Sequence, residues 1–440
     1  MRWKIRAVVV AILVLSAVAL AHGAATAPRT ASADTVPEPE PRDNVTVVTE
    51  SAKYGTLIAW NPDGSVLYYE DEHTKYYDVD PVANESMTVE YAATETIHTE
   101  GPTCSSPPCT RNIVERANLS TGEVEEVYAR YDAEELAAEW HDHDRVDENH
   151  IVIADMIDDQ VFLVDTETQI VEWLWDAQAD FPVEEAGDFP DDWAHLNDVE
   201  VLEDGRVMVS LRNQDQVVFL DRETGLIENQ TLGSENDYGT LHEQHNPDYI
   251  PEERGGPAVL VADSENGRIV EYQRDGDEWT QSWEWSDDRM QWPRDADRLP
   301  NGNTLVADTH GKRVAEIAPN GSVAWSVPVT HPYDAERLGT GGGSSSGQSA
   351  TELDLESRTG DAENEEGGFN PISAFVGGVK SLFPSRLVNG VIYISPVWMG
   401  RPQFLAAGAS LVSLLVLAGL ELRWRFPDVE VRSPFYRDRE

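Results

Sequence analysis

A short polar cluster that ends in aspartate recurs along this chain, each time directly before strand-like alternation of apolar and polar residues. The copies are His141-Asp-His143-Asp144, His195-Leu-Asn197-Asp198, His245-Asn-Pro-Asp248, Trp292-Pro-Arg294-Asp295 and His331-Pro-Tyr-Asp334. Their closing aspartates follow one another at intervals of about 40 to 55 residues, and turns such as Asp204-Gly205 separate the strands within a copy. Three or four short strands in a period of this length are typical of a β-propeller. We therefore predict an all-β fold, a propeller of about six blades.

The repeat also predicts where its polar residues meet. The innermost strand of each blade lines the central channel, so residues at the start of each copy gather at one channel mouth. These residues are His141, His143, His195, His245, Arg294 and His331. Arg212 follows His195 by 17 positions, in the exit turn of the next strand, and we expect it to reach the same mouth. The repeated aspartates themselves are interpreted as structural, each bonding to the neighbouring blade. Histidines outside the register, His310 and His242 among them, are expected to be surface or packing residues.

The chain divides by composition. We predict a signal peptide or N-terminal anchor over 1–27, a disordered Pro/acidic linker over 28–45 and the propeller over 46–338. The alternating runs after Tyr54 are interpreted as a first, atypical blade, and the copy at His331 as a last blade truncated by a Gly/Ser/acidic linker over 339–368. An interfacial segment over 369–402, a transmembrane helix over 403–422 and a cytoplasmic tail over 423–440 follow. Arg423 and Arg425 after the apolar run place the tail inside and the propeller outside the cell.

The charge of the chain is strongly acidic. Asp and Glu number 81 against 32 Lys and Arg, a formal net charge of −49, and only five of the basic residues are lysine. Such a surface suits a protein of high-salt environments, because molar salt shortens the Debye length to roughly 3 Å and screens the self-repulsion. A calcium-rich surface protein is the alternative interpretation. Nucleic-acid binding is disfavoured, since no basic stripe exists to meet phosphate.

The only cysteines, Cys104 and Cys109, lie in one loop. In an exported protein this spacing favours a local disulfide, with two free thiols as the alternative. Zinc binding would need a second pair of ligands, which the sequence lacks.

Serine-hydrolase, P-loop and dinucleotide-binding signatures are absent. The chain resembles the arylsulfate sulfotransferase family of exported β-propellers over roughly residues 55–335. The likeness rests on His195-x-Asn197 with Arg212 downstream, on Gln244-His245 followed by LVADSENGR, and on the earlier HDHD cluster. We suspect a membrane-anchored member of haloarchaeal type.

The resemblance implies a set of roles. His245 would be the nucleophile that forms a transient sulfohistidine, while His195, Asn197 and Arg212 would bind the sulfuryl oxygens. Either His141 or His143 would be the remaining catalytic histidine, and the pattern does not decide between them. Arg294 and His331, at equivalent places in their copies, are expected to contact substrate. The substrates would be an aryl sulfate and a phenol, with no metal and no diffusible cofactor.

Two other functions fit the same pattern. A non-catalytic propeller could bind a small ligand, a glycan or a partner protein at the channel mouth. Aspartate-rich turns such as Asp155-Met-Ile-Asp158-Asp159 could hold calcium in a structural role. Convergence of His195, His245 and Arg212 in one pocket would favour the enzyme, and their dispersion around the ring would favour the binding module.

Overall fold

The computed structural model describes residues 2–26, 33–52, 54–133, 138–184, 187, 189, 192–341, 346–360, 384–396 and 398–425. It contains two compact units. One comprises Met1–Thr30 and Ile394–Glu440, and the other comprises Ala31–Tyr393. The predicted tail beyond residue 425 and the stretch 361–383 lie outside the described residues.

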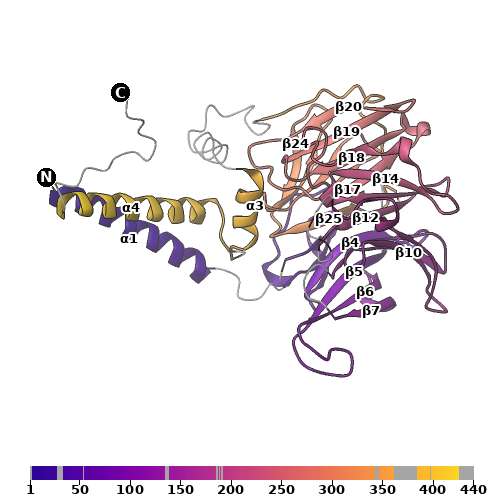
Figure 1. Cartoon of the computed structure of the whole chain (residues 1–440), viewed down its shortest axis with the longest axis horizontal. Helices are drawn as coiled ribbons and strands as arrows, with labels where there is room; N and C mark the ends of the chain where they lie inside the picture. Colours follow the sequence, from indigo (N-terminus) through magenta and orange to yellow (C-terminus); the bar gives the residue numbers. More distant parts are fainter. Residues whose placement is uncertain are drawn as a thin grey trace, which may run out of the picture. The chain divides into compact units, whose positions relative to one another are not determined.

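The larger unit is a six-bladed β-propeller (Figure 1), which confirms the predicted fold. Five blades are each formed by consecutive strands: the first comprises β4 (Lys75–Pro81), β5 (Thr88–Ile97), β6 (Cys109–Asn118) and β7 (Glu123–Asp132), and the second comprises β8 (Trp140–Arg145), β9 (His150–Asp155), β10 (Gln160–Asp165) and β11 (Ile170–Asp176). The third comprises β12 (Leu196–Val201), β13 (Val207–Leu211) and β14 (Gln216–Asp221), with the two-residue strands β15 (Gly225–Leu226) and β16 (Leu232–Gly233). The fourth comprises β17 (His245–Ile250), β18 (Ala258–Asp263), β19 (Arg268–Asp275) and β20 (Glu278–Trp285), and the fifth comprises β21 (Asp295–Arg298), β22 (Thr304–Asp308), β23 (Arg313–Ile317) and β24 (Val323–Val327). Short 3₁₀ turns lie at η1 (Ala33–Thr35), η2 (Ala177–Ala179), η3 (Arg212–Gln214), η4 (Glu228–Gln230) and η5 (Glu252–Arg254).

The sixth blade joins the two ends of the propeller sequence. Its inner strand is β25 (Pro332–Arg337), and β1 (Thr46–Glu50), β2 (Leu57–Trp60) and β3 (Val66–Glu70) complete it. β25 pairs antiparallel with β1, and Thr46 lies opposite Arg337. The prediction of a truncated last blade is therefore wrong, because the copy at His331 supplies the inner strand of the blade that the N-terminal strands begin. The inner strands β4, β8, β12, β17, β21 and β25 contact one another in sequence and close the ring.

The hydrogen bonds between inner strands set the register of the repeat. Asp142 Oδ2 accepts the backbone N–H of Val199 at 3.3 Å, and Asp334 Oδ2 accepts that of Val79 at 2.7 Å. In both bonds the donor is the residue that directly follows an aspartate of the next blade, Asp198 before Val199 and Asp78 before Val79. Asp142 and Asp198, and likewise Asp334 and Asp78, therefore occupy equivalent positions. The equivalent aspartate in the HDHD copy is thus Asp142, and the predicted alignment on Asp144 was two residues out of register. Asp78 on β4 closes the polar cluster of a sixth copy, which was not predicted from the sequence.

Apolar residues of neighbouring blades form the core. Around Trp193, for example, the β9–β10 face packs on the β12–β13 face through Val152, Leu163, Leu196 and Val209, all buried. Strands buried on both faces read as nearly continuous apolar runs, as in AVLVAD of β18. This core holds the inner strands, and therefore the channel residues, in fixed positions.

Part of the predicted linker packs on the propeller. The backbone N–H of Ala350 bonds to Glu271 Oε1 at 2.8 Å, and that of Arg358 bonds to the Glu284 carbonyl at 2.9 Å. Ala350 is buried in the apolar cluster of the β17 and β21 blades. Residues 346–360 are therefore part of the folded unit, although their Gly/Ser/acidic composition predicts a tether.

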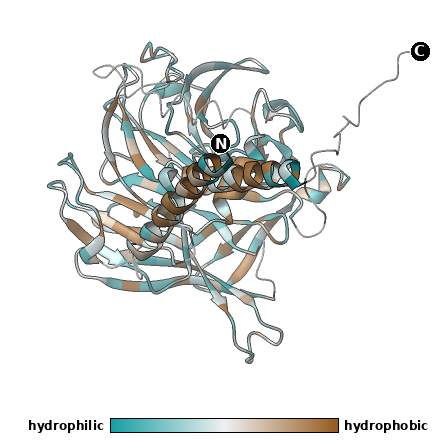
Figure 2. Cartoon of the chain, turned by 90° about the vertical axis from the view of Figure 1, so that its left-hand side faces the viewer, coloured by the Kyte–Doolittle hydropathy of each residue, from teal (hydrophilic) through white to brown (hydrophobic). Residues whose placement is uncertain are grey.

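The described residues of the smaller unit form two helices, α1 (Arg2–Thr26) and α4 (Arg401–Arg425), and both are long and apolar enough to cross a membrane. Figure 2 shows them mostly in the colour of hydrophobic residues. α1 packs on α4, and Arg6 Nε lies 2.5 Å from Glu421 Oε1. Both helices are consistent with membrane anchoring.

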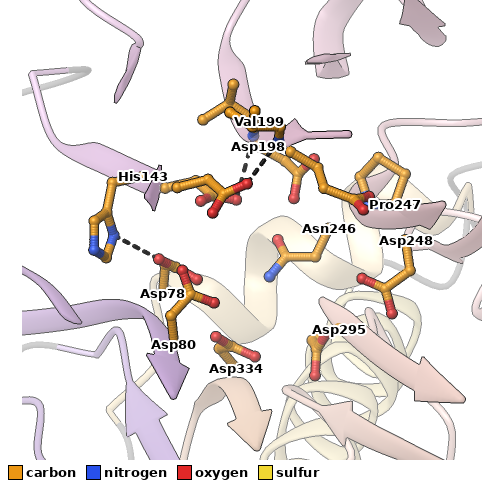
Figure 3. A pocket seen from close by; sticks show the side chains of 14 residues that line it. Asp78, Asp80, His143, Asp198, Val199, Asn246, Pro247, Asp248, Asp295 and Asp334 are labelled. Atoms are coloured by element: carbon orange, nitrogen blue, oxygen red, sulfur yellow. Dashed lines mark hydrogen bonds and ion pairs between the residues drawn. The ribbon is translucent and has the colours of Figure 1, made fainter. Parts of the chain in front are cut away.

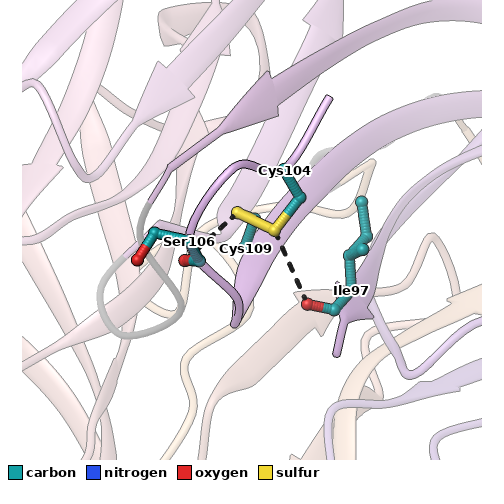
Figure 4. The surroundings of a disulfide bond; sticks show 4 residues. All are labelled: Ile97, Cys104, Ser106 and Cys109. Atoms are coloured by element: carbon teal, nitrogen blue, oxygen red, sulfur yellow. Dashed lines mark hydrogen bonds between the residues drawn. A yellow bond between two sulfur atoms is a disulfide. The ribbon is translucent and has the colours of Figure 1, made fainter. Parts of the chain in front are cut away.

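The predicted disulfide is confirmed. A disulfide joins Cys104, in the loop that follows β5, to Cys109, the first residue of β6 (Figure 4). Both residues are buried.

Candidate functional site

The channel residues lie in rings because all six inner strands run in the same direction. Counted back from the aspartates at 78, 142, 198, 248, 295 and 334, the positions one residue earlier are Tyr77, His141, Asn197, Pro247, Arg294 and Tyr333. The positions three residues earlier are Lys75, Glu139, His195, His245, Trp292 and His331. Histidine, arginine and aromatic side chains therefore occupy the channel end at which the inner strands begin.

Irregular pairing directs several of these side chains inward. The β8–β9 register shifts between Trp140 and Asp142, at His141, and the β12–β13 register shifts between Leu196 and Asp198, at Asn197. Such bulges re-aim a side chain out of the regular alternation. His195 and Trp292 also have positive φ angles, 51° and 54°, which are uncommon for such residues and cluster at functional sites.

Most of the predicted site residues come together. The rings of His141 and His195 are 5.3 Å apart, and Arg212 Nη1 lies 3.1 Å from His195 Nδ1. Tyr333 joins the group, with its ring 5.6 Å from that of His141 and 6.3 Å from that of His245. We call His141, His195, His245, Arg212 and Arg294 with Tyr77 and Tyr333 the histidine cluster.

His141 and His143 occupy different surroundings. His141 stacks on Tyr77 at 4.5 Å in the histidine cluster. His143 lies among acidic residues, with Nδ1 2.7 Å from Asp78 Oδ2 and Nε2 3.8 Å from Glu90 Oε2. Burial opposes its protonation, but these carboxylates raise the pKa of His143 to about 10. The geometry thus selects His141 as the histidine that faces His195, a choice the HDHD pattern left open.

His331 stands at the edge of the cluster. Its ring is 5.9 Å from that of His310, which lies 4.4 Å from the Trp292 ring. Burial lowers the pKa of His331 to about 3, so the imidazole is neutral at physiological pH.

Hydrogen bonds orient the His245 ring. Nδ1 lies 2.8 Å from Ser264 Oγ and 3.2 Å from the Glu243 carbonyl, and the Ser264 hydroxyl donates to the Pro293 carbonyl at 2.7 Å. With the hydroxyl hydrogen engaged, Nδ1 carries the proton and donates it, which leaves the lone pair on Nε2. Burial, then the nearby Arg294 and Arg212, lower the pKa of His245 well below its usual value. The side chain is a neutral imidazole with an unprotonated Nε2.

His195 has two competing partners at one nitrogen. Nδ1 lies 2.5 Å from Asp192 Oδ1 as well as 3.1 Å from Arg212 Nη1. A carboxylate only accepts and a guanidinium only donates, so one tautomer satisfies only one of them. Burial lowers the pKa of His195, and Arg212 lowers it further. Arg212 is held in turn by Glu243, with Nη2 2.7 Å from Oε2.

Arg294 is a buried cation between two aromatic rings. Its guanidinium carbon lies 4.4 Å from the centre of the Trp292 ring and 4.9 Å from that of Tyr333. Nη1 donates to Ser51 Oγ at 3.0 Å, while the buried Nε has no hydrogen-bond partner among the described residues. No carboxylate of the residues that the structure describes lies within ion-pair distance of this guanidinium. A desolvated cation without a counter-ion creates a site for an anion.

Asn197 connects two inner strands. Its Nδ2 donates to the Gln244 carbonyl at 2.8 Å, next to His245, and its backbone carbonyl accepts from Tyr333 Oη at 3.3 Å. The side chain is buried, and one amide hydrogen is committed to the Gln244 bond.

The channel changes sign along its length. Beyond the histidine cluster lie the six aspartates of the repeat, which we call the acidic ring, and Figure 3 shows most of them around one cavity of about 190 Å³. Burial raises the pKa of Asp142 and Asp334 well above the usual value, and neighbouring carboxylates raise it further. An anionic substrate is therefore favoured only at the end that contains Arg212 and Arg294.

A helix of the same unit covers the histidine end. α3 (Ser385–Tyr393) places Arg386 Nη2 2.7 Å from Glu243 Oε1, and Asn389 Nδ2 donates to Glu265 Oε2 at 3.0 Å. Gln291 Nε2 also donates to Asn389 Oδ1, and the Tyr393 ring lies 6.1 Å from that of Trp292. A substrate that enters from this end has to pass or displace α3.

Several residues of the site were missed from the sequence. Tyr333 lies within the HPYD copy, and alignment on Asp78 would have found Tyr77 at the matching position. His310, expected to be a surface or packing residue, is buried against Trp292 beside the histidine cluster. No sequence signal distinguishes Ser264, which orients His245.

The proposed calcium turn is tied down by protein contacts. Asp155 Oδ2 pairs with Arg130 Nη2 at 2.6 Å, and Asp159 Oδ1 accepts the backbone N–H of Ala194 at 2.9 Å. The two carboxylates stabilise the β8 blade by these contacts.

Comparison with known proteins gives one family. Residues 131–330, fewer than half of the chain, match the family model of the arylsulfotransferases (ASST). This range contains His141, His195, Arg212, His245 and Arg294. No curated protein matches the chain.

The solved structures that it resembles are distant. A Bacteroides caccae protein of unknown function is 10% identical with a TM-score of 0.46, covering 66% of this chain and 97% of that one. A periplasmic gluconolactonase of Pseudomonas aeruginosa is 14% identical with a TM-score of 0.43, covering 68% and 99%. A virginiamycin B lyase of Staphylococcus aureus is 9% identical with a TM-score of 0.39, covering 66% and 85%. At these values the likenesses say nothing about activity.

Proposed function

We propose that the protein is an aryl sulfotransferase-like enzyme that moves a sulfuryl group from an aryl sulfate to a phenol through a sulfohistidine on His245. The observation that carries the proposal is Arg294, a buried guanidinium without a carboxylate partner among the described residues, beside three neutral imidazoles. This is a site for a small anion next to a nucleophile. The family match over residues 131–330 supports the same class of reaction.

In the first step, the Nε2 lone pair of His245 attacks sulfur as the sulfur–oxygen bond to the aryl group breaks. The phenolate departs with the bonding electrons, and the imidazole keeps its Nδ1 proton, which Ser264 and the Glu243 carbonyl hold. The group in transit is trigonal and carries charge on three oxygens, as in phosphoryl transfer. The guanidinium groups of Arg294 and Arg212 provide fixed donors for those oxygens.

In the second step, the acceptor phenol attacks sulfur, the nitrogen–sulfur bond breaks and His245 returns to its neutral form. His195 takes the phenol proton: burial and Arg212 lower its pKa, so the imidazole is neutral before this step and its unprotonated nitrogen can accept. The proton then leaves to solvent. Over the cycle one phenolate and one proton are released for each sulfuryl group transferred. Tyr77, His141 and Tyr333 would pack on the aromatic rings of donor and acceptor.

The experiment is transfer from 4-nitrophenyl sulfate to a phenol by the full chain in detergent. His245→Ala should abolish transfer, while His150→Ala, at an exposed pair with Asp147, should leave it unchanged. Donor alone should leave SO₃ on the peptide that carries His245, detectable by mass spectrometry. Transfer that survives in His245→Ala would place the nucleophile elsewhere. Absence of transfer with every donor, together with saturable binding of an aryl sulfate, would favour a non-catalytic binding module.

We further propose that the propeller lies outside the cell and that α4 anchors it in the membrane. α1 is either a second membrane anchor or a signal peptide that is cleaved. The support is the length and apolar character of both helices and the arginines that end α4. External protease on intact cells should digest the propeller, and complete protection would contradict this topology.

A further inference from the structure

We propose that the channel binds one hard divalent cation of the calcium class at the acidic ring, a site separate from the histidine cluster and independent of the transfer chemistry. Six aspartates from six different inner strands surround the cavity: Asp78, Asp142, Asp198, Asp248, Asp295 and Asp334. Among them, Asp78 and Asp142 each bring one carboxylate oxygen within 4.8 Å of the other.

The carboxylates are held in place by the fold. Asp142, Asp295 and Asp334 each use Oδ2 to accept a backbone N–H of the next blade, at 3.3, 3.3 and 2.7 Å. Asp334 is held through its second oxygen as well, because Oδ1 accepts the backbone N–H of Ala335 at 2.6 Å. Figure 3 shows the labelled aspartates converging on the cavity. A cation at the centre would meet oxygens supplied by rigid strands rather than by mobile loops.

The charge of the cavity is unbalanced. Among the described residues no lysine or arginine lines it, and its one histidine, His143, places Nδ1 2.7 Å from Asp78 Oδ2. Burying several carboxylates with so little compensation is unfavourable unless a cation accompanies them. Charge alone does not identify a ligand, however, because carboxylates can also share protons.

Asn246 provides the independent observation. Its side chain extends into the ring between Asp198 and Asp334 in Figure 3, and the residue is 6% exposed. The buried Oδ1 has no hydrogen-bond partner among the described residues. The backbone φ of 35° is uncommon for a residue other than glycine. A neutral amide oxygen aimed into a ring of carboxylates completes an all-oxygen ligand set, which protons would not require.

The ligand set favours calcium over magnesium. Ca²⁺ accepts six to eight oxygens, including amide oxygens, in irregular geometry, whereas Mg²⁺ requires a compact octahedron. Oxygens that six strands present around a cavity of about 190 Å³ suit the larger ion. Because Asn246 directly follows His245, the cation would also fix the backbone on which His245 stands.

The experiment is calorimetric titration of the chelator-treated full chain with CaCl₂ in buffered KCl. We expect one saturable site, and a melting temperature that rises with CaCl₂ because the ion binds only the folded state. Asn246→Ala and Asp198→Asn should each weaken binding by at least about tenfold. Asp277→Asn changes the same charge at a side chain that is 76% exposed, and should bind as the wild type does.

The variant Asn246→Asp is the control that separates loss of a Ca²⁺ ligand from a folding defect. It keeps an oxygen at the same place and adds a charge, so it should bind Ca²⁺ at least as tightly as the wild type, while a purely structural asparagine would make both Asn246 variants equally destabilised. Absence of a saturable site in the wild type would overturn the proposal. Equal Ca²⁺ affinity in the wild type, Asn246→Ala and Asp198→Asn would also overturn it.

Discussion

Arg294 stacks on Trp292 with its guanidinium carbon 4.4 Å from the ring centre, and no carboxylate among the described residues lies close enough to neutralise it. Arg212, the other arginine of the histidine cluster, has Glu243 as a partner at 2.7 Å. The two cations therefore differ in how much they gain from a bound anion. This difference leads to the first prediction.

Arg294→Met should weaken transfer more than Arg212→Met does. Loss of one oxyanion donor costs roughly a hundred- to a thousandfold in turnover, and Arg294 has no competing carboxylate. Arg294→Lys should restore only part of the activity, because lysine lacks the planar fork. Initial rates with 4-nitrophenyl sulfate decide it, with the exposed Arg222→Met as the matched control. Equal losses at both positions would show that the Glu243 pairing is irrelevant to anion binding.

A histidine outside the histidine cluster should make stability depend on pH. His73 contacts two carboxylates, with Nε2 2.8 Å from Glu115 and Nδ1 3.2 Å from Glu95. Burial opposes its protonation, but these partners raise the pKa of His73 to about 9. The folded value lies above the unfolded value of about 6.5, so the stabilisation is complete below about 6.5 and is lost as pH rises through about 9.

His73→Gln should therefore lower the free energy of unfolding by roughly 1–3 kcal/mol at pH 6 and by little at pH 10. Denaturant titrations of wild type and variant at both pH values measure the difference. A deficit that does not change with pH would mean that His73 contributes only by packing.

The Cys104–Cys109 disulfide should contribute modestly to stability. The cysteines are separated by five positions, and so short a loop removes little entropy from the unfolded chain, about 2 kcal/mol at most. The double variant Cys104→Ser/Cys109→Ser should fold and lose no more than that in a denaturant titration. Failure to fold would instead assign the disulfide a decisive role in forming the β5–β6 hairpin.

The net charge of −49 predicts salt dependence. Removing molar KCl lengthens the Debye length and restores repulsion among surface carboxylates, so the melting temperature should fall by far more than for a neutral protein. Calorimetric scans from molar to low salt test this at constant CaCl₂. A flat melting temperature would contradict the high-salt interpretation.

Much of this structure can be predicted from the sequence, because residues that are close together in the chain determine the strands and turns of each repeat. Alternation and turn residues indicate six blades, and the aspartate register places His195 and His245 at one end of the channel. Prediction from the sequence fails where the structure departs from the regular strand pattern. The bulge at His141 removes the two-residue alternation, so nothing in HDHD distinguishes His141 from His143.

Long-range pairing is the other limit. The apolar alternation of residues 46–70 looks like an incomplete blade because its inner strand comes from residues 332–337. Likewise Ala350 and Asn389 are buried by partners far away in sequence, within segments whose composition indicates a linker or an interfacial stretch. Composition reports the average environment of a segment and misses one buried contact within it.

The pairing of β1 with β25 also sets an order of events during synthesis. Strands β1–β3 emerge first, yet the edge of β1 stays open until Pro332–Arg337 has been made and can occupy it. During that interval the nascent chain carries an unpaired strand edge, which is a template for wrong partners. The ring can therefore close only late in synthesis. A chain released before β25 is made would have five complete blades and an open strand edge. We expect such a chain to aggregate or be degraded rather than to function as a shorter protein.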